Sequence, residues 1–426
     1  MAAEGSRGLS QRACWAGGES VVSRLMAQAL AHPELISLAA GFVDEKTLPV
    51  EPTRRALDAL WSDPSRARAA LQYGTTIGHL PLREDILNRM IEADGPRNGR
   101  PTPTVHQVVI TAGSNQLLHL VSDTLLDPGD IVLCGAPSYF VFLGTLCNLG
   151  VRTVGIESDS DGLIPEAIEA ELARREADGE LGRVKAIYAT TYYDNPSGVT
   201  TPADRRRQMV EIARRWSREG KIYLIEDAAY RELRYYGDDV PSMHSFDPDG
   251  DRVIYAGTFS KSYSPGIRVG WGVLPPELVT PLLAQKGNVD FGSPHFSQML
   301  MATVLERGLF DEHLERLRAE YRRKLDATLD AADRWLAPVG GIDWVRPSGG
   351  LYLWLRLPEP IDTGLDSPLF HRAVDEGVLY VPGECCYPGQ GCPRHKNLLR
   401  LSFGVPSIEE IRRGVERLAR AIRHVR

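Results

Sequence analysis

One lysine, Lys261, lies in a run of hydroxyl, glycine and other small residues that reads GTFSKSYSPGIRVGWG over 257–272. Thr258 and Ser260 place hydroxyl groups before it, and Arg268 follows with a fixed fork of N–H donors. Groups of this kind bind phosphate oxygens. A lysine amine beside a phosphate site favours a Schiff base with a phosphorylated aldehyde, and pyridoxal phosphate is the cofactor of that type. The alternative is an ordinary solvated lysine.

The ends of two expected strands carry groups that suit a phosphate and a flat ring. Ser114 and Asn115 lie in a turn between an expected strand at 107–111 and a helix, and N–H groups at a helix N-terminus bind anions. A plain N-cap would use the same residues. Tyr139 ends the next strand region, where its ring could stack on a cofactor. A core tyrosine is the alternative there.

Three further polar residues follow expected strands. Asn195 opens the loop NPSG, and its amide could donate to a phenolate oxygen; an ordinary Asn-Pro turn is the alternative. Asp227 ends the strand IYLIED, where a buried carboxylate needs a partner such as a protonated pyridine nitrogen. Tyr230 comes three residues later and could donate to the phenolic oxygen. A capping role would also explain Asp227.

Arg400 lies within the apolar, strand-like run LLRLSFG. A buried arginine needs an anion, and its planar fork matches a carboxylate in two hydrogen bonds. The sequence therefore predicts a site for a substrate carboxylate at Arg400. A structural ion pair would satisfy the same residue.

These residues need a scaffold that brings strand ends together, and the pattern of elements predicts one. Short apolar runs alternate with helical segments between positions 107 and 260. Such alternation favours an α/β fold with a mostly parallel sheet covered on both faces, and ligands of such sheets lie beyond the carboxyl ends of the strands. Strands are expected at 107–111, 131–136, 151–157, 185–191, 221–227 and 253–260, and helices at 21–31, 52–61, 81–90, 165–177 and 204–218.

The last quarter of the chain has a different order of expected helices and strands. One long helix is expected at 310–335, followed by a strand pair around Trp344 and 351–355, a helix near 370–376 and a terminal amphipathic helix. This predicts a smaller α+β domain. We expect residues 1–60 to form an N-terminal arm and part of the small domain, residues 61–330 the large domain and residues 331–426 the rest of the small domain. Residues 1–20 are expected to be irregular.

The composition limits the partners. The chain has 426 residues, a net charge of −7 and no long apolar run, so neither nucleic acid nor a membrane is an expected partner. The N-terminus lacks an apolar signal core, which favours a cytoplasmic location. Six cysteines do not make a disulfide framework in a chain of this length. Cys385, Cys386 and Cys392 lie near His395, but their spacing matches no common zinc pattern, so no metal is predicted.

The order of these features resembles that of fold-type I, class I and II aminotransferases over nearly the whole chain from about residue 35. Asp227 follows Asn195 by 32 residues, and Lys261 follows Asp227 by 34. The strings QYGTTIGHLPLRE, FSKSYSPGIRVGW, PSGGLYLWL and VPGE are similar to the branch that holds 2-aminoadipate and kynurenine aminotransferases. The resemblance implies a large domain with a mostly parallel, seven-stranded sheet, a smaller α+β domain, and a homodimer with shared active sites.

The resemblance also implies a role for each residue. Lys261 would form the Schiff base and move the proton, while Asp227 and Tyr230 would complete the catalytic group. The expected cofactor-binding residues are Ser114, Asn115, Tyr139, Asn195, Asp227, Tyr230, Thr258, Ser260, Lys261 and Arg268, with Tyr73 reaching the phosphate of the neighbouring subunit. Arg400, Gly41 and Asn195 would bind the substrate.

The chain departs from the family pattern near the substrate. The loop reads YYDNPSG where FQNPTG is usual, so Tyr193, Asp194 and Ser197 are substitutions, and the N-terminal segment has Ala40 in place of a glycine. We expect Ala40 and Tyr193 to border the substrate. Tyrosines at 73, 139 and 193, together with the loop at 385–392, favour a pocket for aromatic or long aliphatic side chains.

The predicted reaction is a ping-pong transamination in amino acid metabolism or biosynthesis. An L-amino acid gives its amino group to the enzyme, which passes it to a 2-oxo acid such as 2-oxoglutarate or pyruvate. One alternative keeps the fold and cofactor but acts as a lyase, decarboxylase or synthase. A more distant alternative is the effector-binding domain of a transcription regulator, for which the N-terminal segment is too short and not basic enough.

Overall fold

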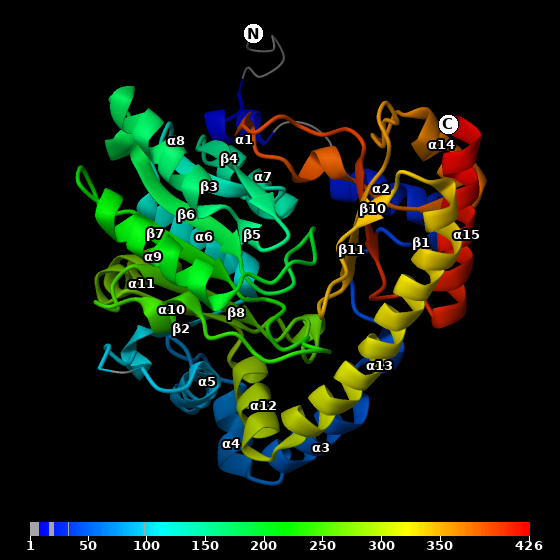
Figure 1. Cartoon of the computed structure of the whole chain (residues 1–426). Coiled ribbons are helices and arrows are strands. Elements are labelled where there is room, and N and C mark those ends of the chain that lie inside the picture. The colour runs from blue at the N-terminus through cyan, green and yellow to red at the C-terminus, as the bar shows by residue number, and fades with distance from the viewer. Residues whose placement is uncertain (1–7, 17–20, 33, 98) are drawn as a thin grey trace.

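The computed structural model describes residues 8–16, 21–32, 34–97 and 99–426. Its largest unit is a β-sheet with the strand order β14-β4-β3-β6-β7-β8-β9-β2, to which β5 adds beside β4 (Figure 1). The strands are β2 (Val108–Thr111), β3 (Ile131–Ala136), β4 (Arg152–Asp159), β5 (Gly162–Leu163), β6 (Val184–Thr190), β7 (Tyr223–Asp227), β8 (Val253–Thr258), β9 (Gly270–Val273) and β14 (Gln390–Gly391).

The predicted mostly parallel sheet is confirmed. Strands β4, β3, β6, β7 and β8 pair in parallel, whereas β9 runs antiparallel to both β8 and β2. The seven expected strands correspond to those of four or more residues, and the two-residue strands β5 and β14 extend the sheet. Since β9 reverses the direction between β8 and β2, the carboxyl ends of β2, β3, β6, β7 and β8 lie at one edge.

Helices cover both faces of this sheet. One face packs against α6 (Ser114–Leu125), α7 (Phe140–Asn148) and α11 (Pro276–Asp290), and the other against α8 (Pro165–Ala177), α9 (Ala203–Trp216) and the short α10 (Met243–Phe246). Side chains alternate between the two cores along a strand, so Val132 faces α6 and α7 while Leu133 faces α8 and α9. Because both faces are buried, the strands are almost continuously apolar.

A group of helices packs against the β2 edge of the sheet. It contains α3 (Val50–Trp61), α5 (Leu80–Asp94), α12 (His295–Glu306) and α13 (Leu309–Ala331), and α4 (Pro64–Ala70) packs on α3 and α12. The long helix expected at 310–335 is confirmed as α13, whose buried Leu314, Leu317, Tyr321 and Leu325 follow a spacing of three to four residues. After Ala331 the backbone widens into a π-helical turn (Ala332–Leu336) and then the 3-10 turn Ala337–Val339.

A smaller sheet lies at the far end of α13 (Figure 1). It has the antiparallel order β10-β11-β15-β13, and β1 pairs in parallel with β12 beside it. The strands are β1 (Ile36–Ser37), β10 (Asp343–Trp344), β11 (Tyr352–Arg356), β12 (Val378–Leu379), β13 (Val381–Pro382) and β15 (Leu398–Ser402), and the helices are α2 (Val21–Ala31), α14 (Pro368–Asp375) and α15 (Ile408–Val425). The β1–β12 pair joins the N-terminal segment to the C-terminal part of the chain.

Several short elements complete the fold. The expectation of an irregular arm over residues 1–20 is wrong for its described part, because α1 (Gln11–Trp15) is helical and capped by the Ser10 hydroxyl. Residues 1–7 and 17–20 lie outside the described ranges. The remaining 3-10 turns are Glu45–Thr47, Val105–Gln107, Leu181–Arg183, Pro265–Ile267 and Gly383–Cys386.

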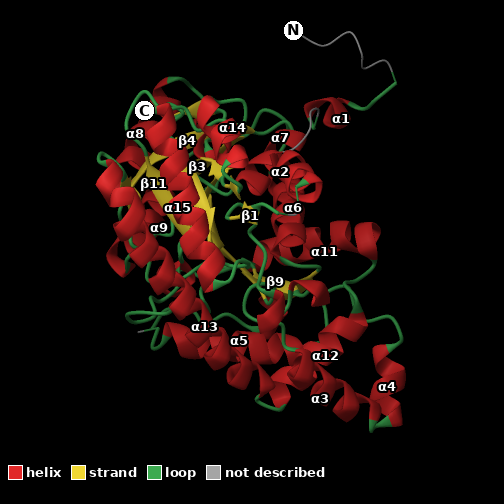
Figure 2. Cartoon of the chain, turned by 90° about the vertical axis from the view of Figure 1, so that its right-hand side faces the viewer, coloured by secondary structure: helices red, strands yellow, loops and turns green. Residues whose placement is uncertain are grey.

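The two views place α3, α4 and α12 at the end of the molecule opposite to α1 and α14 (Figure 2). Helix α13 runs between these ends and so connects the large sheet's helices to the small sheet (Figure 1). Within the described ranges, none of the helices has both the length and the apolar character that crossing a membrane requires.

Candidate active site

Two cavities that share part of their lining lie where the carboxyl ends of the large sheet face the small sheet. The polar cavity has a volume of about 260 Å³ and is lined by Phe42, Ser114, Asn115, Tyr139, Thr190, Asn195, Asp227, Ala229, Tyr230, Thr258, Ser260, Lys261, Pro265 and Arg268. The apolar cavity, of about 400 Å³, is lined by Leu25, Ser37, Ala39, Ala40, Gly41, Phe42, Tyr139, Phe140, Val141, Asn195, Tyr230, Lys261, Tyr352, Val381 and Arg400. Lys261 lines both cavities.

The loop after β8 carries Lys261 to the boundary between the cavities. Its Nζ donates a hydrogen bond of 2.7 Å to the carbonyl oxygen of Gly41. Burial lowers the pKa of the Lys261 ammonium, and the charges of Arg400 and Arg268 lower it further. A lowered pKa makes the neutral, nucleophilic amine more accessible near neutral pH.

The N-terminus of α6 forms one end of the polar cavity. Gly113 precedes the helix with φ of +83°, and a side chain there would meet the Arg268 guanidinium. Arg268 itself donates to the Ala112 carbonyl over 2.8 Å. A Cβ atom at Gly270 would lie 2.5 Å from the backbone nitrogen of Ser114. These two glycines therefore let the turn before α6 pack directly on β9, beside Arg268.

Hydroxyl groups complete this end of the polar cavity. Thr258 Oγ1 donates to Ser260 Oγ over 2.9 Å, and both residues line the cavity together with Ser114 and Arg268. Backbone N–H groups at a helix N-terminus, two hydroxyls and a guanidinium form a donor set for a phosphate. The structure thus brings the five predicted phosphate-binding residues, Asn115 included, to one place.

Asp227 lies at the end of β7 on the floor of the polar cavity and is only 4% exposed. Its carboxylate accepts hydrogen bonds from the Tyr188 hydroxyl at 2.9 Å and the Ala229 backbone N–H at 3.1 Å. Burial raises the pKa of Asp227, while these two bonds oppose the rise. A cationic group in the cavity would compensate the buried charge, and a protonated pyridine nitrogen is such a group.

Asn195 and Arg400 meet at the boundary between the two cavities. Arg400 Nη1 donates to Asn195 Oδ1 over 2.6 Å, and Nη2 donates to the Ala39 carbonyl over 2.8 Å. The Nε atom of Arg400 has no hydrogen-bond partner among the described residues, although the side chain is only 2% exposed. A buried guanidinium with an unused donor fits a bound carboxylate. The Asn195–Pro196 peptide bond is cis.

The two predicted tyrosines of the site lie in the wall between the cavities. Tyr139 precedes α7, and its hydroxyl donates to Asn115 Oδ1 over 3.4 Å. The Tyr230 hydroxyl lies 2.8 Å from the hydroxyl of Tyr352, which is a residue that sequence reasoning missed. Tyr188, the partner of Asp227, was missed as well. In both cases the signal lies in strand register, which brings these side chains to the site from β11 and β6.

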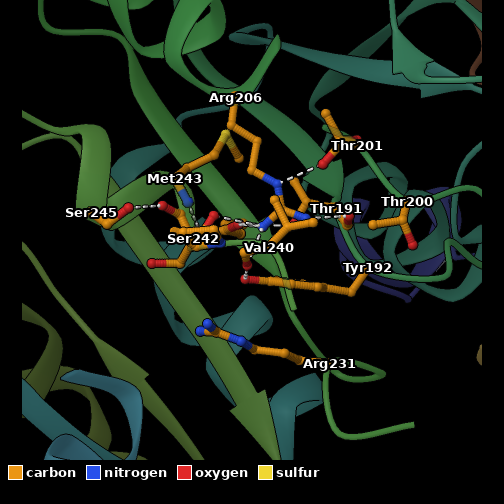
Figure 3. A network of polar contacts seen from close by, with 12 residues as sticks. Thr191, Tyr192, Thr200, Thr201, Arg206, Arg231, Val240, Ser242, Met243 and Ser245 are labelled. Atoms are coloured by element: carbon orange, nitrogen blue, oxygen red, sulfur yellow. Dashed lines mark hydrogen bonds and ion pairs between the residues drawn. The ribbon is translucent and has the colours of Figure 1, made fainter. Parts of the chain in front are cut away.

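A buried network supports the loop that carries Asn195. Arg206, on α9, donates to the carbonyl oxygens of Thr191 and Thr201, which flank this loop, over 2.7 and 2.8 Å. Its Nη1 lies 3.4 Å from the carboxylate of Glu226, the residue before Asp227. Figure 3 shows Tyr192 between the side chains of Arg206 and Arg231. This network therefore connects the loop after β6 to the end of β7.

Two predicted residues lie away from both cavities. Tyr73 is 81% exposed and makes an edge-to-face ring contact with Phe291, so it takes no part in the site of its own chain. The expectation that Tyr193 borders the substrate is wrong. Its backbone has φ of +46°, and its ring packs against Gly349 and lines neither cavity. Ala40 does line the apolar cavity, as expected.

The cysteine-rich loop also lies outside both cavities. Cys386 is buried next to β3, and the Cys392 thiol donates to the Gly155 carbonyl of β4. The expectation that residues 385–392 help to form the pocket is therefore wrong. No group of three or more His, Cys, Asp or Glu side chains placed to hold a metal occurs within the described ranges.

The residues present fit pyridoxal phosphate. The polar cavity offers phosphate donors at one end and a carboxylate, an amide and a tyrosine hydroxyl at the other, with the Lys261 amine beside them. The buried Asp227 carboxylate has no cation among the described residues, and the cofactor's ring nitrogen would supply one. The Arg400 side of the apolar cavity remains for an amino acid carboxylate.

Comparison with known proteins finds similar chains over nearly the whole sequence. A family model described as aminotransferase class I and II matches residues 33–418. An aromatic-amino-acid aminotransferase of Thermococcus litoralis is 35% identical over 394 residues, which cover 92% of this chain and 88% of the relative.

Two solved structures share the fold over nearly their whole length. Kynurenine aminotransferase of Pyrococcus horikoshii, in complex with PMP, with KYN as substrates and KYA as products, matches with a TM-score of 0.89 and 32% identity, covering 99% of this chain and 98% of that one. The α-aminoadipate aminotransferase of Thermus thermophilus, complexed with N-(5'-phosphopyridoxyl)-L-leucine, matches with a TM-score of 0.84 and 31% identity, again covering 99% and 98%.

Proposed function

Because the chain belongs to the class I and II aminotransferases, we propose that its amino donors are amino acids with aromatic or other large apolar side chains. The protein is an aminotransferase that uses pyridoxal phosphate. The acceptor we propose is 2-oxoglutarate or pyruvate, in a ping-pong exchange within amino acid metabolism or biosynthesis; pyruvate fits the apolar cavity better, because it carries no second carboxylate. The observation that carries the donor class is the lining of the apolar cavity.

Among the described residues that line the apolar cavity, Arg400 is the cation available to a substrate carboxylate. Leu25, Phe42, Phe140 and Val381 are among its apolar lining residues, and Arg400 is the charged residue beside Lys261 in its described lining. The guanidinium of Arg24, on the same helix as Leu25, pairs with Asp366 over 2.9 Å and lies outside this lining. A second carboxylate on the donor would therefore be buried without a partner, which is costly.

The residues of the chain then take distinct roles. When bound, pyridoxal phosphate supplies an aldehyde for the amino group and a conjugated ring that delocalises negative charge from the donor's Cα. Arg400 holds the donor's α-carboxylate, and Asp227 keeps the proton on the ring nitrogen. The Lys261 amine would bind the aldehyde at rest, with loss of water, and would take the Cα proton once the donor has displaced it. Ser114, Asn115, Thr258, Ser260 and Arg268 would hold the phosphate.

A panel of L-amino acids tests the donor class. Each donor is mixed with the loaded enzyme without oxo acid, and the loss of its visible absorption band is followed by stopped flow. We expect the second-order rate constants of phenylalanine, tyrosine and leucine to exceed those of glutamate and aspartate by at least about tenfold. The reason is that burying an unpaired carboxylate costs more than about 1.4 kcal/mol. Faster reaction with glutamate would contradict the donor class. Release of ammonia or carbon dioxide would indicate a lyase or decarboxylase.

We also propose a homodimer in which Tyr73 serves the phosphate site of the neighbouring subunit. Apolar rings gather on one exposed surface, where Trp61 contacts Phe296 and Tyr73 contacts Phe291 at centroid distances of 5.7 and 5.3 Å. Exposed apolar patches of this kind indicate protein interfaces. Phe42, also exposed, lines both cavities.

Mixed dimers test the shared site. The Tyr73→Ala and Lys261→Ala homodimers should both be impaired, whereas co-refolding them should restore roughly a quarter of the native activity, because half of the dimers are mixed and each has one intact site. The matched control is Tyr236→Ala, which removes another exposed tyrosine. Its homodimer should keep the native activity. A monomeric mass on sedimentation, or no recovery on mixing, would contradict the shared site.

We place the reaction in the cytoplasm. All six cysteines are free, and the pair Cys385 and Cys386 is adjacent in the chain without a disulfide. Free cysteines are typical of a reducing compartment.

A further inference from the structure

Tyr352 places a hydroxyl group in the wall of the apolar cavity. It lies on β11, and the antiparallel register puts Trp354 opposite Arg400, so Tyr352 is the diagonal neighbour of Arg400 on the same sheet. The guanidinium of Arg400 lies 4.3 Å from the centre of the Tyr352 ring. The side chain is only 2% exposed, and its hydroxyl is 2.8 Å from that of Tyr230. Tyr352 therefore contacts both Arg400, where a substrate carboxylate is predicted, and Tyr230, which is predicted to bind the cofactor.

The contacts around Tyr352 leave little freedom for this hydroxyl. A Cβ atom at Gly41 would lie 2.8 Å from the Tyr352 oxygen, so the glycine gives the hydroxyl its space. The carbonyl oxygen of the same glycine accepts the bond from Lys261. Among the described residues, the Tyr352 hydroxyl has the Tyr230 hydroxyl as its hydrogen-bond partner. Tyr352 thus joins the Gly41 segment to Tyr230.

Either of the two hydroxyls could donate in this bond. Each tyrosine hydroxyl has one proton to donate, so only one of the two can donate to the other. If Tyr230 donated, the proton of Tyr352 would point into a buried, largely apolar space, and a buried donor without an acceptor is costly. If Tyr352 donates, the proton of Tyr230 is free for the polar cavity, which Tyr230 also lines.

We propose that Tyr352 is a positioning residue that donates to Tyr230 and thereby directs the Tyr230 proton toward the phenolic oxygen of pyridoxal phosphate. The inference rests on the proposed role of Tyr230. A hydroxyl that accepts one hydrogen bond becomes a stronger donor in the next. Tyr352 therefore strengthens the Tyr230 bond that stabilises negative charge on the phenolic oxygen. When the negative charge on the phenolic oxygen is stabilised, the neighbouring nitrogen, to which Lys261 is linked, holds its proton less tightly.

The pH titration of the visible absorption band of the loaded enzyme tests this. Tyr230→Phe removes the donor, so the linked nitrogen should keep its proton to a pH higher by about one unit, as expected for one hydrogen bond. Tyr352→Phe should shift the midpoint in the same direction by roughly a third to a half as much. The double variant should titrate like Tyr230→Phe alone, because Tyr352 acts only through Tyr230.

Tyr380→Phe is the matched control. Tyr380 is a buried tyrosine of the small sheet region whose hydroxyl donates to the Thr363 carbonyl, so its loss tests a general effect on stability. We expect its midpoint to equal that of the native enzyme. A shift in Tyr230→Phe without one in Tyr352→Phe would overturn the inference and leave the role of Tyr230 intact. No shift in Tyr230→Phe would overturn that role and the inference together, and additive shifts in the double variant would overturn the inference.

Discussion

Replacement of Lys261 by alanine is expected to abolish the visible absorption band of the loaded enzyme and to lower the transamination rate by at least about 10²–10⁴-fold. The amine of Lys261 lines both cavities and is the group proposed to bind the aldehyde and to move the Cα proton. Its lowered pKa suits both tasks. The donors around Ser114 and Arg268 remain in the variant, so the cofactor should still bind without a covalent link.

The spectrum and the rate of Lys261→Ala are measured against Lys185→Ala. Lys185 also donates through its Nζ to one backbone carbonyl, that of Gly182, but it lies near the start of β6, at the opposite end of the strand from the site. The Lys185 variant should keep the native spectrum and rate. A small primary amine added to the Lys261 variant should restore part of the proton transfer. Native activity of Lys261→Ala without such an amine would refute the assignment.

Replacement of Arg206 by methionine is expected to lower the free energy of unfolding by about 3–5 kcal/mol, because it leaves a buried charge without its partner. Arg206 and Glu226 are both fully buried, with their charged groups 3.4 Å apart. The Glu226 carboxylate also accepts bonds from the Thr191 hydroxyl and the Met243 backbone N–H, over 2.7 and 2.8 Å. Loss of Arg206 also frees the carbonyl groups of Thr191 and Thr201 that hold the Asn195 loop.

Urea unfolding of three variants separates these effects. The double variant Arg206→Met/Glu226→Gln should recover part of the lost stability, because it removes the unpaired charge as well. Arg207→Met is the control, since the adjacent arginine forms an exposed pair with Asp204, which should contribute little. If Arg206→Met unfolded like the native protein, the network would have no stabilising role. If the double variant were no more stable than the single one, the charge would not be the cause.

The sheet of the large unit was predictable because its strands carry a strong local signal. Runs such as VVIT and YLIED are buried on both faces, so apolar length marks them without any tertiary information. Strand β9 and helix α7 gave weaker signals. Gly270 and Gly272 make β9 poor in side chains, and α7 directly follows Tyr139 in a segment for which no element was predicted. Their pairing and packing depend on distant parts of the chain.

Most of the candidate site was predictable for a related reason. Residues such as Asn195, Asp227 and Lys261 each follow a parallel strand, and parallel strands end at one edge. Tyr352 and Tyr188 reach the site through register across strands, which no local string reveals. Tyr193 follows the same strand as Asn195, but its left-handed backbone conformation turns the ring into the core. Local sequence therefore predicted strand ends better than side-chain directions.

The short strand β14 has a further consequence for the behaviour of the chain in solution. Gln390 and Gly391 pair with Val154 and Gly155 on β4, which is otherwise the outermost long strand of the large sheet. Exposed edge strands offer unpaired backbone groups to other chains and favour aggregation through intermolecular β-pairing. The cysteine-rich loop occupies part of that edge, where the Cys392 thiol also donates to Gly155. A loop with no side chain in either cavity thus covers part of an edge that other chains could otherwise pair with.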